Sequence, residues 1–555
     1  MVGTGTTTAP FVAALWTYLT YTAMYIWGHF YDFFVSIGQT STTPTGYAPI
    51  RQEFEEFFTR RFYRRVHDCF ARPICSNPGS WIDVMDRTKL DVDCMMGKKE
   101  LELTGTTTRS LNLGSYNYLG FAAYDPHCTP KVLKAMREHG WASGSARAHG
   151  GSTLEHEALD REVAAFVGKP AAITCAMGFA TNAFFIPSIA TKGTLIISDS
   201  LNHASIVTGS RGAPAKVTVF RHNEPEHLER VLREAIVQGQ PRTHRPWSKI
   251  IIIVEGIYSM EGEICRLAEI VEIKNRYRAY LYVDEAHSIG ALGATGRGVC
   301  EHCGVDPADI DVLMGTFTKS FGSCGGYIAG SEELIEHLRR TSPAEVHACA
   351  MSVPAVAMVR GALDVIAGRD GTTRGVEKIE RLRRNADRFR ERLLRMRLSV
   401  LGDWGSPVIP IMIFQPNHMG MFSRMALEEN VAVVVVDFPA TPLMTARARI
   451  CLSASHTDED MDYALDVLER IAGKLSIRHG GALSIYHADK RAAEREAERA
   501  AQADAPAAAP AVKRSAAQGT LALSPSKAAP ALAAGQAEHG ARALAVPGFA
   551  IASSA

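Results

Sequence analysis

Residues 279–288 read AYLYVDEAHS, an apolar, strand-forming run that ends in acidic residues and a histidine. Similar runs rich in β-branched residues occupy 194–198 and 249–254, and an amphipathic, helix-forming stretch at 226–237 separates them. Such alternation is typical of parallel βαβ units with helices on both faces of the sheet. From about 110 to 350 the chain is therefore predicted to be α/β, with ligands gathering at the carboxyl ends of the strands.

Composition excludes several classes of protein. The 555 residues are 46% hydrophobic and 21% charged, which is sufficient for two or three domains with large cores. With 60 basic and 59 acidic residues the net charge is +1, so no nucleic-acid partner is expected. The 11 cysteines lack pairing spacings, and Cys300 and Cys303 form a lone CxxC without a second ligand pair. We therefore expect free thiols in a reducing compartment and no metal.

The N-terminus is predicted to associate with a membrane. No charged residue precedes Asp32, and 11–35 is apolar and aromatic, long enough for the roughly 20 residues of a bilayer span. Its aromatic rings and threonines are equally consistent with a helix lying in the interface. The alternative, a buried helix of a soluble domain, is less favoured because the segment has no charged face to meet water. Arginines between 51 and 65 indicate that the remainder faces the cytosol.

The pattern divides the chain into five parts. A membrane-associated segment (1–45) and an N-terminal arm (46–110) precede the large domain (111–355). A smaller α+β domain (356–480) follows. The rest, 481–555, is Ala-rich with Pro, Ser and charge, which predicts a charged helical extension and then disorder.

Lys319 is the first candidate for chemistry. It follows Gly-Thr-Phe-Thr and precedes Ser-Phe-Gly, in a hydroxyl- and glycine-rich turn after the apolar run 311–314. Desolvation there lowers a lysine pKa, as Schiff-base chemistry requires. Alone the signal is weak, because most lysines near glycine turns are surface charges.

Other residues at strand ends suit pyridoxal phosphate (PLP). Asp284 could face the pyridine nitrogen and His287 the phenolic oxygen, whereas a helix-capping role explains Asp284 but not His287. His203, beyond the strand 194–198, could stack on the ring. Gly178 and Phe179 open a predicted helix whose N–H groups suit a phosphate, to which Ser259 could add a hydroxyl.

Six motifs together resemble the α-oxoamine synthases. They are SYNYLG (115–120), MGFATN (177–182), DSLNHASIV (199–207), VEGIYSMEGEI (254–264), YVDEAHSIGALGATGRG (282–298) and GTFTKSFGSCGGYI (315–328). This family acylates amino acids with acyl-CoA and then releases CO₂. The resemblance implies an α/β, fold-type I PLP-dependent transferase, with an aspartate aminotransferase-like large domain, a smaller α+β C-terminal domain and, here, an N-terminal membrane helix.

Within the family, three further segments are similar to the catalytic, lysine-bearing subunits of a eukaryotic branch: ARPICSNPG (71–79), residues 221–247 and FPATP (438–442). Those subunits condense L-serine with palmitoyl-CoA to 3-ketosphinganine, the first step of sphingolipid synthesis. The resemblance spans about residues 10 to 475. It implies a heterodimer with a lysine-less partner subunit, contact with membrane lipid, and a place on the endoplasmic reticulum membrane with the catalytic domain facing the cytosol.

The resemblance also assigns roles to residues. It makes Lys319 the Schiff-base lysine and implies the same roles for Asp284, His287 and His203 as above. Phosphate and ring contacts are implied for Gly178, Phe179, Ser259, Thr316 and Thr318.

Two departures from the family pattern affect the substrate side. Asp437 stands where soluble bacterial relatives carry an arginine for the substrate carboxylate, so Arg449 is the candidate for that role. The series 144–147 reads Gly-Ser-Ala-Arg rather than Cys-Ser-Thr-Arg, which bears on the contacts near Arg147.

Two alternatives remain open from the sequence. One is another α-oxoamine synthase that makes 5-aminolevulinate, 8-amino-7-oxononanoate or 2-amino-3-ketobutyrate; these relatives are soluble and lack an aromatic membrane segment. The other is a non-catalytic scaffold subunit, which lacks the lysine. The run 11–35 argues against the first, and Lys319 within an intact motif argues against the second.

Overall fold

The computed structural model divides into two compact units, Met1–Arg495 and Glu496–Ala555. All strands among the described residues belong to the first unit. The described residues are 11–36, 47–48, 63–91, 94, 100–438, 441–442 and 444–504.

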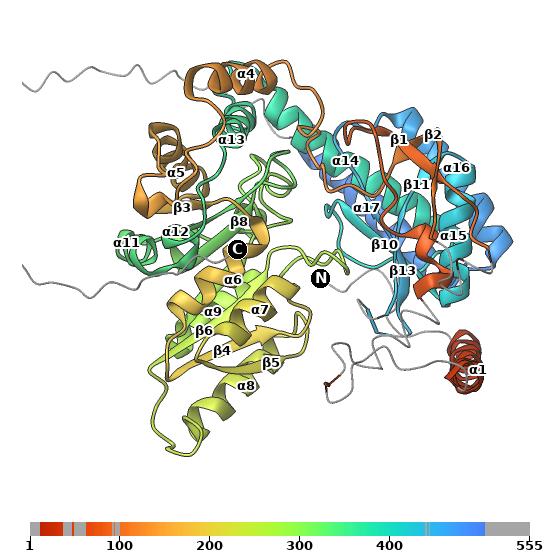
Figure 1. Cartoon of the computed structure of the whole chain (residues 1–555), viewed down its shortest axis with the longest axis horizontal. Helices are drawn as coiled ribbons and strands as arrows, with labels where there is room; N and C mark the ends of the chain where they lie inside the picture. Colours follow the sequence, from red (N-terminus) through yellow and green to blue (C-terminus); the bar gives the residue numbers. More distant parts are fainter. Residues whose placement is uncertain are drawn as a thin grey trace, which may run out of the picture. The chain divides into compact units, whose positions relative to one another are not determined.

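A seven-stranded sheet forms the centre of the large domain, in the order β3-β9-β8-β7-β6-β4-β5 (Figure 1). Strands β5, β4, β6, β7 and β8 are parallel, and β9 runs antiparallel to β8 and β3. This confirms the predicted α/β alternation. The strands are β3 Ala171–Cys175, β4 Thr194–Asp199, β5 Lys216–Phe220, β6 Lys249–Glu255, β7 Tyr280–Asp284, β8 Val312–Thr316 and β9 Gly326–Gly330.

Both faces of this sheet are covered by helices, which explains its continuous apolar strands. Ile252 and Leu281 belong to the core on one face, and Ile251 and Tyr282 to the core on the other. The first face packs against α5 Leu154–Val167, α8 Pro225–Gln238, α9 Leu267–Tyr277 and α13 Val353–Ile366. The second face packs against α6 Gly178–Ile189, α7 Ala204–Gly212, α11 Glu332–Thr341 and α12 Pro343–Val346.

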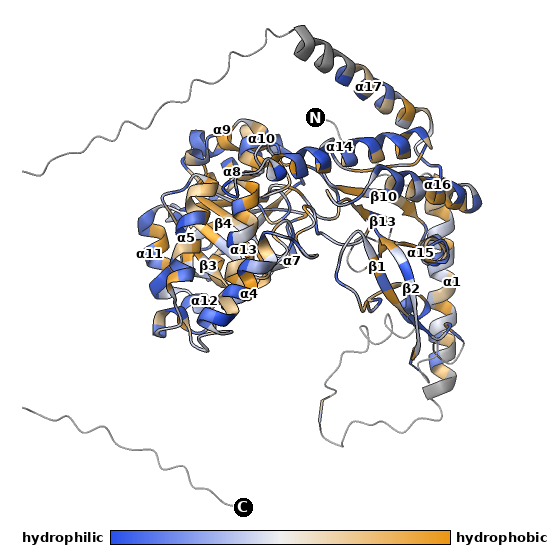
Figure 2. Cartoon of the chain, turned by 90° about the horizontal axis from the view of Figure 1, so that it is seen from above, coloured by the Kyte–Doolittle hydropathy of each residue, from blue (hydrophilic) through white to orange (hydrophobic). Residues whose placement is uncertain are grey.

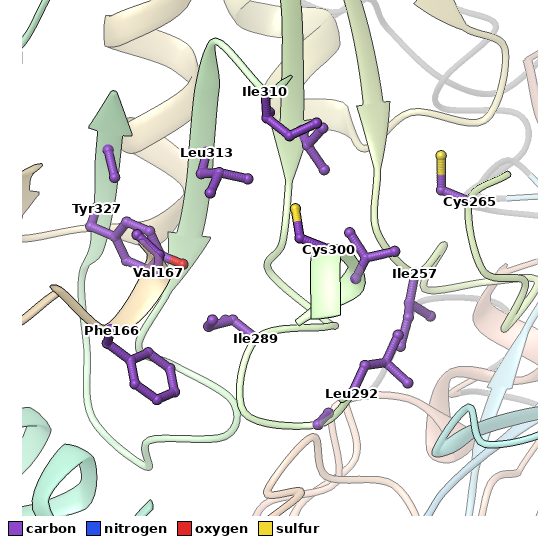
Figure 3. Close-up of a cluster of buried hydrophobic side chains, with 14 of the residues drawn as sticks. Phe166, Val167, Ile257, Cys265, Ile289, Leu292, Cys300, Ile310, Leu313 and Tyr327 are labelled. Carbon is purple, nitrogen blue, oxygen red and sulfur yellow. The ribbon is translucent and has the colours of Figure 1, made fainter. Parts of the chain in front are cut away.

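The first core continues beyond the sheet into the loops that follow its strands. In Figure 3 the ring of Tyr327 from β9 lies beside Val167 at the end of α5, with Leu313 of β8 close by. Ile289 and Leu292, which follow β7, extend the same cluster. Two further helices of this domain are α4 Cys128–His139 and α10 Val299–Cys303.

The small domain contains two three-stranded sheets. One has the order β10-β13-β12, and the other β1-β2-β11. The predicted N-terminal arm therefore contributes β1 and β2 to this domain, where Leu111 joins the C-terminal core. The strands are β1 Trp81–Arg87, β2 Leu103–Asn112, β10 Val408–Phe414, β11 Val431–Ala432, β12 Val434–Val436 and β13 Ala446–Cys451, covered by α14 Arg374–Arg395, α15 Pro416–Glu428 and α16 Asp458–Leu475.

The expected division after residue 355 falls inside α13, whose buried side chains belong to the large-domain core. The connection to the small domain is instead α14, whose exposed face is strongly hydrophilic (Figure 2). The predicted charged extension is helical over α17 Gly481–Asp504. The tail expected to be disordered, 505–555, lies outside the described residues.

Helix α1, Phe11–Ser36, contacts the small domain through small side chains. Ala13 packs with Leu401, Met412 and Phe414, and Thr17 one turn later is also buried. The opposite side exposes large apolar residues, among them Phe11, Trp16, Leu19, Ile26, Trp27, Phe30 and Phe33. Within the described chain, no helix combines the length and the apolarity that crossing a bilayer requires, so the predicted membrane helix is not confirmed.

Arg390 provides a test of the small-domain fold. Its fully buried guanidinium on α14 donates to the carbonyls of Leu401, Gly402 and Val408. We expect Arg390→Gln to lower the free energy of unfolding by about 3 kcal/mol, because those carbonyls lose a charged donor. Chemical denaturation of the cofactor-free chain measures it. Arg384→Gln, at an exposed position on the same helix, is the control and should change little.

Candidate active site

Asp284 lies at the carboxyl end of β7, directly opposite Glu255 of β6 in the strand register. Both of its carboxylate oxygens accept hydrogen bonds. The amide of Asn182, on α6, donates to Oδ2 at 2.7 Å, and the backbone N–H of Ala286 donates to Oδ1 at 2.8 Å. The orientation of Asp284 is therefore set before any ligand binds.

His203 is the N-cap residue of α7 and follows β4, as expected. Its backbone N–H donates to the Glu255 carboxyl, and its Nδ1 lies 2.7 Å from the hydroxyl of Ser205. Ser205 also accepts a hydrogen bond from Asn182. The His203 residue is exposed, with Phe179 edge-on to its ring at 6.2 Å. An exposed, oriented imidazole of this kind is available for stacking.

His287 is buried between two tyrosines of the SYNYLG motif. Its Nδ1 lies 2.8 Å from the Tyr118 hydroxyl, and the Tyr116 ring meets the imidazole edge-on at 4.7 Å. Burial holds the pKa of His287 well below its ordinary value, with the nearby Lys319 and Arg449 charges acting in the same direction. The imidazole is therefore neutral at physiological pH.

The Lys319 ammonium nitrogen lies 5.8 Å from the centroid of the Tyr116 ring. Among the described residues it has no hydrogen-bond or ion-pair partner. Burial lowers the pKa of Lys319 to about 8, against the opposing charges of Asp284 and Glu255. Burial also raises the pKa of Glu255 well above its ordinary value, and the charge of Asp284 acts in the same direction. About one-tenth of Lys319 is therefore deprotonated at pH 7 and about half near pH 8, which supplies the neutral amine that a nucleophilic lysine requires.

A corner suited to phosphate forms where α6 begins. A Cβ added at Gly178 would lie 2.6 Å from Oγ1 of Thr316, so only glycine allows this approach. That oxygen lies 2.9 Å from Oγ1 of Thr318. Helix N-termini with free N–H groups and nearby hydroxyls are suitable anion sites. Ser259 has no contact with this corner in the described part of the chain, so its predicted phosphate role stays a prediction.

Arg449 reaches the site from β13 of the small domain. Its guanidinium carbon lies 4.4 Å from the Tyr116 ring centroid, and Nη1 lies 3.5 Å from the sulfur of Met260. It is 8% exposed, and no carboxylate pairs with it among the residues described. A buried guanidinium without a counterion suits an anionic ligand.

The two departures from the family pattern lie outside this group. Asp437 accepts a hydrogen bond from Tyr21 of α1, at 3.3 Å. Arg147 is buried in an ion pair with Asp160 at 2.9 Å.

Comparison with known proteins identifies the family. Residues 108–468 match the model described as aminotransferase class I and II. The chain belongs to this family.

Curated relatives show which members of the family this chain is similar to. The chain is 54% identical over 472 residues to long chain base biosynthesis protein 2a of Oryza sativa subsp. japonica, covering 85% of this chain and 96% of that one. It is 51% identical over 437 residues to serine palmitoyltransferase 2 of Dictyostelium discoideum, covering 79% and 88%. The α-oxoamine synthase resemblance seen in the motifs is confirmed.

Solved structures agree. Sphingomonas wittichii serine palmitoyltransferase is 27% identical, with a TM-score of 0.67 over 78% of this chain and 100% of that one. A structure described as SPT with the PLP internal aldimine is 25% identical, with a TM-score of 0.66 over 77% and 100%. The α/β transferase fold expected from the sequence is thus confirmed for this aminotransferase-family chain.

Several residues of the aminotransferase-family site received no role from the sequence alone. Asn182, Glu255, Tyr116 and Tyr118 all lie inside the quoted motifs, but neutral or buried side chains give no local sign of which neighbour they contact. Asn182 is the most connected, since it also accepts from the Tyr282 hydroxyl at 2.7 Å. Only the position of these side chains in a motif could have identified them.

The residues present fit PLP. The Gly178 corner suits its phosphate, the held carboxylate of Asp284 suits a pyridinium, His203 offers a stacking ring, and Lys319 is an unpaired amine. Within the described residues, no group of three or more His, Cys, Asp or Glu could hold a metal ion.

Capture of PLP by the cofactor-free chain should depend on pH through Lys319. Only the neutral amine attacks the aldehyde, and burial lowers the pKa of Lys319 to about 8. The capture rate should therefore rise roughly tenfold per pH unit below about pH 7 and level off near pH 9. Stopped-flow absorbance measures it. A rate that keeps rising past pH 10 would contradict the assignment.

Proposed function

We propose that this chain is the catalytic subunit of a serine palmitoyltransferase, which condenses L-serine with palmitoyl-CoA to give 3-ketosphinganine, CO₂ and free CoA. The observation that carries the proposal is Lys319, which has a lowered pKa and no partner among the described residues, and whose pKa responds to the charges of both Asp284 and Arg449. The names of the relatives at 51–54% identity support the substrates. A scaffold subunit would need neither a deprotonated lysine nor a buried guanidinium without a counterion.

PLP, when bound, supplies the electron sink for carbanion chemistry at the serine Cα. Asp284, oriented by Asn182 and Ala286, would hold a proton at the pyridine nitrogen. Lys319 Nζ would remove the Cα proton, and its lowered pKa lets it act as a base near neutral pH. His203 would stack on the cofactor ring and help to orient it.

Arg449 binds the serine carboxylate. Its guanidinium is packed on Tyr116, which also contacts His287, so one aromatic ring aligns the carboxylate site with the cofactor site. A bidentate contact with a planar carboxylate is what guanidinium geometry favours. Neutral His287 can share a proton with the phenolic oxygen without adding a further positive charge beside Lys319 and Arg449.

Substitution of Lys319 tests the proposal. In the chain co-expressed with a lysine-less partner, Lys319→Ala should reduce 3-ketosphinganine formation at least about a thousandfold and remove the absorbance of lysine-bound PLP, because no other amine replaces it. Lys319→Arg keeps the positive charge and should be equally inactive. The exposed Lys192→Ala is the matched control and should be unchanged. Wild-type chain that produces nothing from serine and palmitoyl-CoA would refute the proposed function.

The proposed function also includes a partner subunit and attachment to a membrane. Met177 and Phe179 are 60% and 44% exposed at the edge of the site, as expected of a surface covered by a second subunit. We expect the lysine-less subunit to cover it, giving a heterodimer. Helix α1 would rest on the cytosolic face of the endoplasmic reticulum, because Ala13, Thr17 and Tyr21 contact the small domain while most of its large apolar side chains face outward.

The outward side of α1 should carry membrane attachment. Burying one large apolar side chain is worth ~1.5–3 kcal/mol, so several dominate partitioning. Deletion of residues 1–45, or the triple change Trp16→Ser, Leu19→Ser and Trp27→Ser, should release the chain from membranes with PLP absorbance retained. Fractionation with parallel spectra is the measurement. The exposed Thr22→Ser is the control. Full retention of both variants on membranes without the partner would mean that another surface attaches the chain.

A further inference from the structure

The turn that carries Ser259 belongs to the large domain but is held by the small domain. Arg447 of β13 donates from Nη1 to the backbone carbonyl of Met260 at 2.7 Å and to the Glu261 carboxylate at 3.0 Å. Its Nε donates to the carbonyl of Thr445 at 2.9 Å. A single guanidinium therefore ties this turn to β13 and to the residue just before the strand.

The Arg447–Glu261 ion pair is buried. The two side chains are 4% and 11% exposed. Burial lowers the pKa of Arg447 and raises that of Glu261, and in each case the charge of the partner opposes the shift. Removing one member of such a pair leaves an uncompensated buried charge, so the turn and the strand are strongly coupled.

Arg449 shares this attachment. Residues two apart on a strand face the same side, and the register confirms it for Arg447 and Arg449, which lie opposite Met412 and Pro410 of β10. Met260 contacts both arginines, through its carbonyl and its sulfur. The position of Arg449 therefore depends on the same turn that Arg447 fixes.

The turn has little freedom to relax if that contact is lost. Gly262 has φ +69°, and a Cβ there would lie 2.3 Å from the carbonyl oxygen of Val408. Asp403 donates its backbone N–H to the Gly262 carbonyl at 3.2 Å and accepts the N–H of Ile264 at 2.8 Å. Asp403 of the small domain therefore holds one end of the turn through its backbone N–H and its carboxylate, and Arg447 holds the other end.

We propose that Arg447 and Glu261 are positioning residues that set the place of the Arg449 guanidinium relative to Lys319, and with it the affinity for the amino-acid carboxylate. The inference rests on the proposed function. If the Arg447–Glu261 pair only joined the two domains, its loss would lower stability alone. If it positions Arg449, its loss also weakens the binding of serine.

The test uses the chain co-expressed with a lysine-less partner and compares Glu261→Gln, Arg447→Gln and their double variant. Serine KM, serine-induced change in PLP absorbance and kcat are measured for each, together with thermal unfolding of the cofactor-free chain. Arg447→Lys keeps the charge and one donor, so it serves where Arg447→Gln does not fold. Arg388→Gln breaks an ion pair with Asp462 on the surface of the same domain and is the matched control.

Each single variant should raise serine KM about tenfold and lower kcat less than about threefold, because a ground-state carboxylate contact is weakened. The serine KM of the double variant should be no higher than that of the more affected single variant. Arg447→Lys should restore part of the lost affinity for serine. A KM within twofold of wild type in Glu261→Gln, or effects that multiply in the double variant, would overturn the inference. A wild-type enzyme without activity on serine would instead contradict the proposed function.

Discussion

The hydrogen bond from the Asn182 amide to the Asp284 carboxylate is the contact on which the rest of the site depends. It joins the end of β7 to α6, whose first residue, Gly178, forms the phosphate corner. The same amide reaches Ser205, which holds the imidazole of His203. The phosphate corner, the acid and the stacking ring are thus set by one neutral side chain. An amide suits this place, because it donates to two acceptors without adding charge beside Lys319.

The charges of the site are unbalanced in a way that favours anionic ligands. Two basic side chains, Lys319 and Arg449, lie in the site, and burial raises the pKa of the Glu255 carboxyl there. His287 stays neutral and adds nothing. A phosphate and a carboxylate would supply the missing negative charge in a partly buried space, where such interactions are stronger than in water. Burial lowers the pKa of Lys319, and the charge of Arg449 acts in the same direction, whereas the carboxyls of Asp284 and Glu255 oppose the shift.

Local patterns predicted the central strands, the helix at Gly178 and the residues with unusual chemistry, Lys319, Asp284 and His287. Each of these produces a signal within a few residues of itself. The positions of Glu255 and Asn182 depend on strand register and on helix packing across the sheet, which no local pattern contains. The arm was placed apart from the small domain for the same reason. Its strand β2 pairs with β11, more than 300 residues away in sequence, which only tertiary structure reveals.

Asp437 explains why the position of Arg449 matters so much in this chain. Soluble bacterial relatives carry an arginine at that place for the substrate carboxylate, whereas here an acid stands there. Burial raises the pKa of Asp437 to about 6, and the Tyr21 hydroxyl of α1 donates to its carboxylate. The position is therefore used to dock the N-terminal helix and is closed to an anionic substrate. Arg449 is left as the one buried guanidinium beside Tyr116 among the described residues, so an error in its position cannot be offset by a second arginine there. If Arg449 holds the carboxylate as proposed, its place depends on the turn at Met260, which the buried Arg447–Glu261 ion pair attaches to β13.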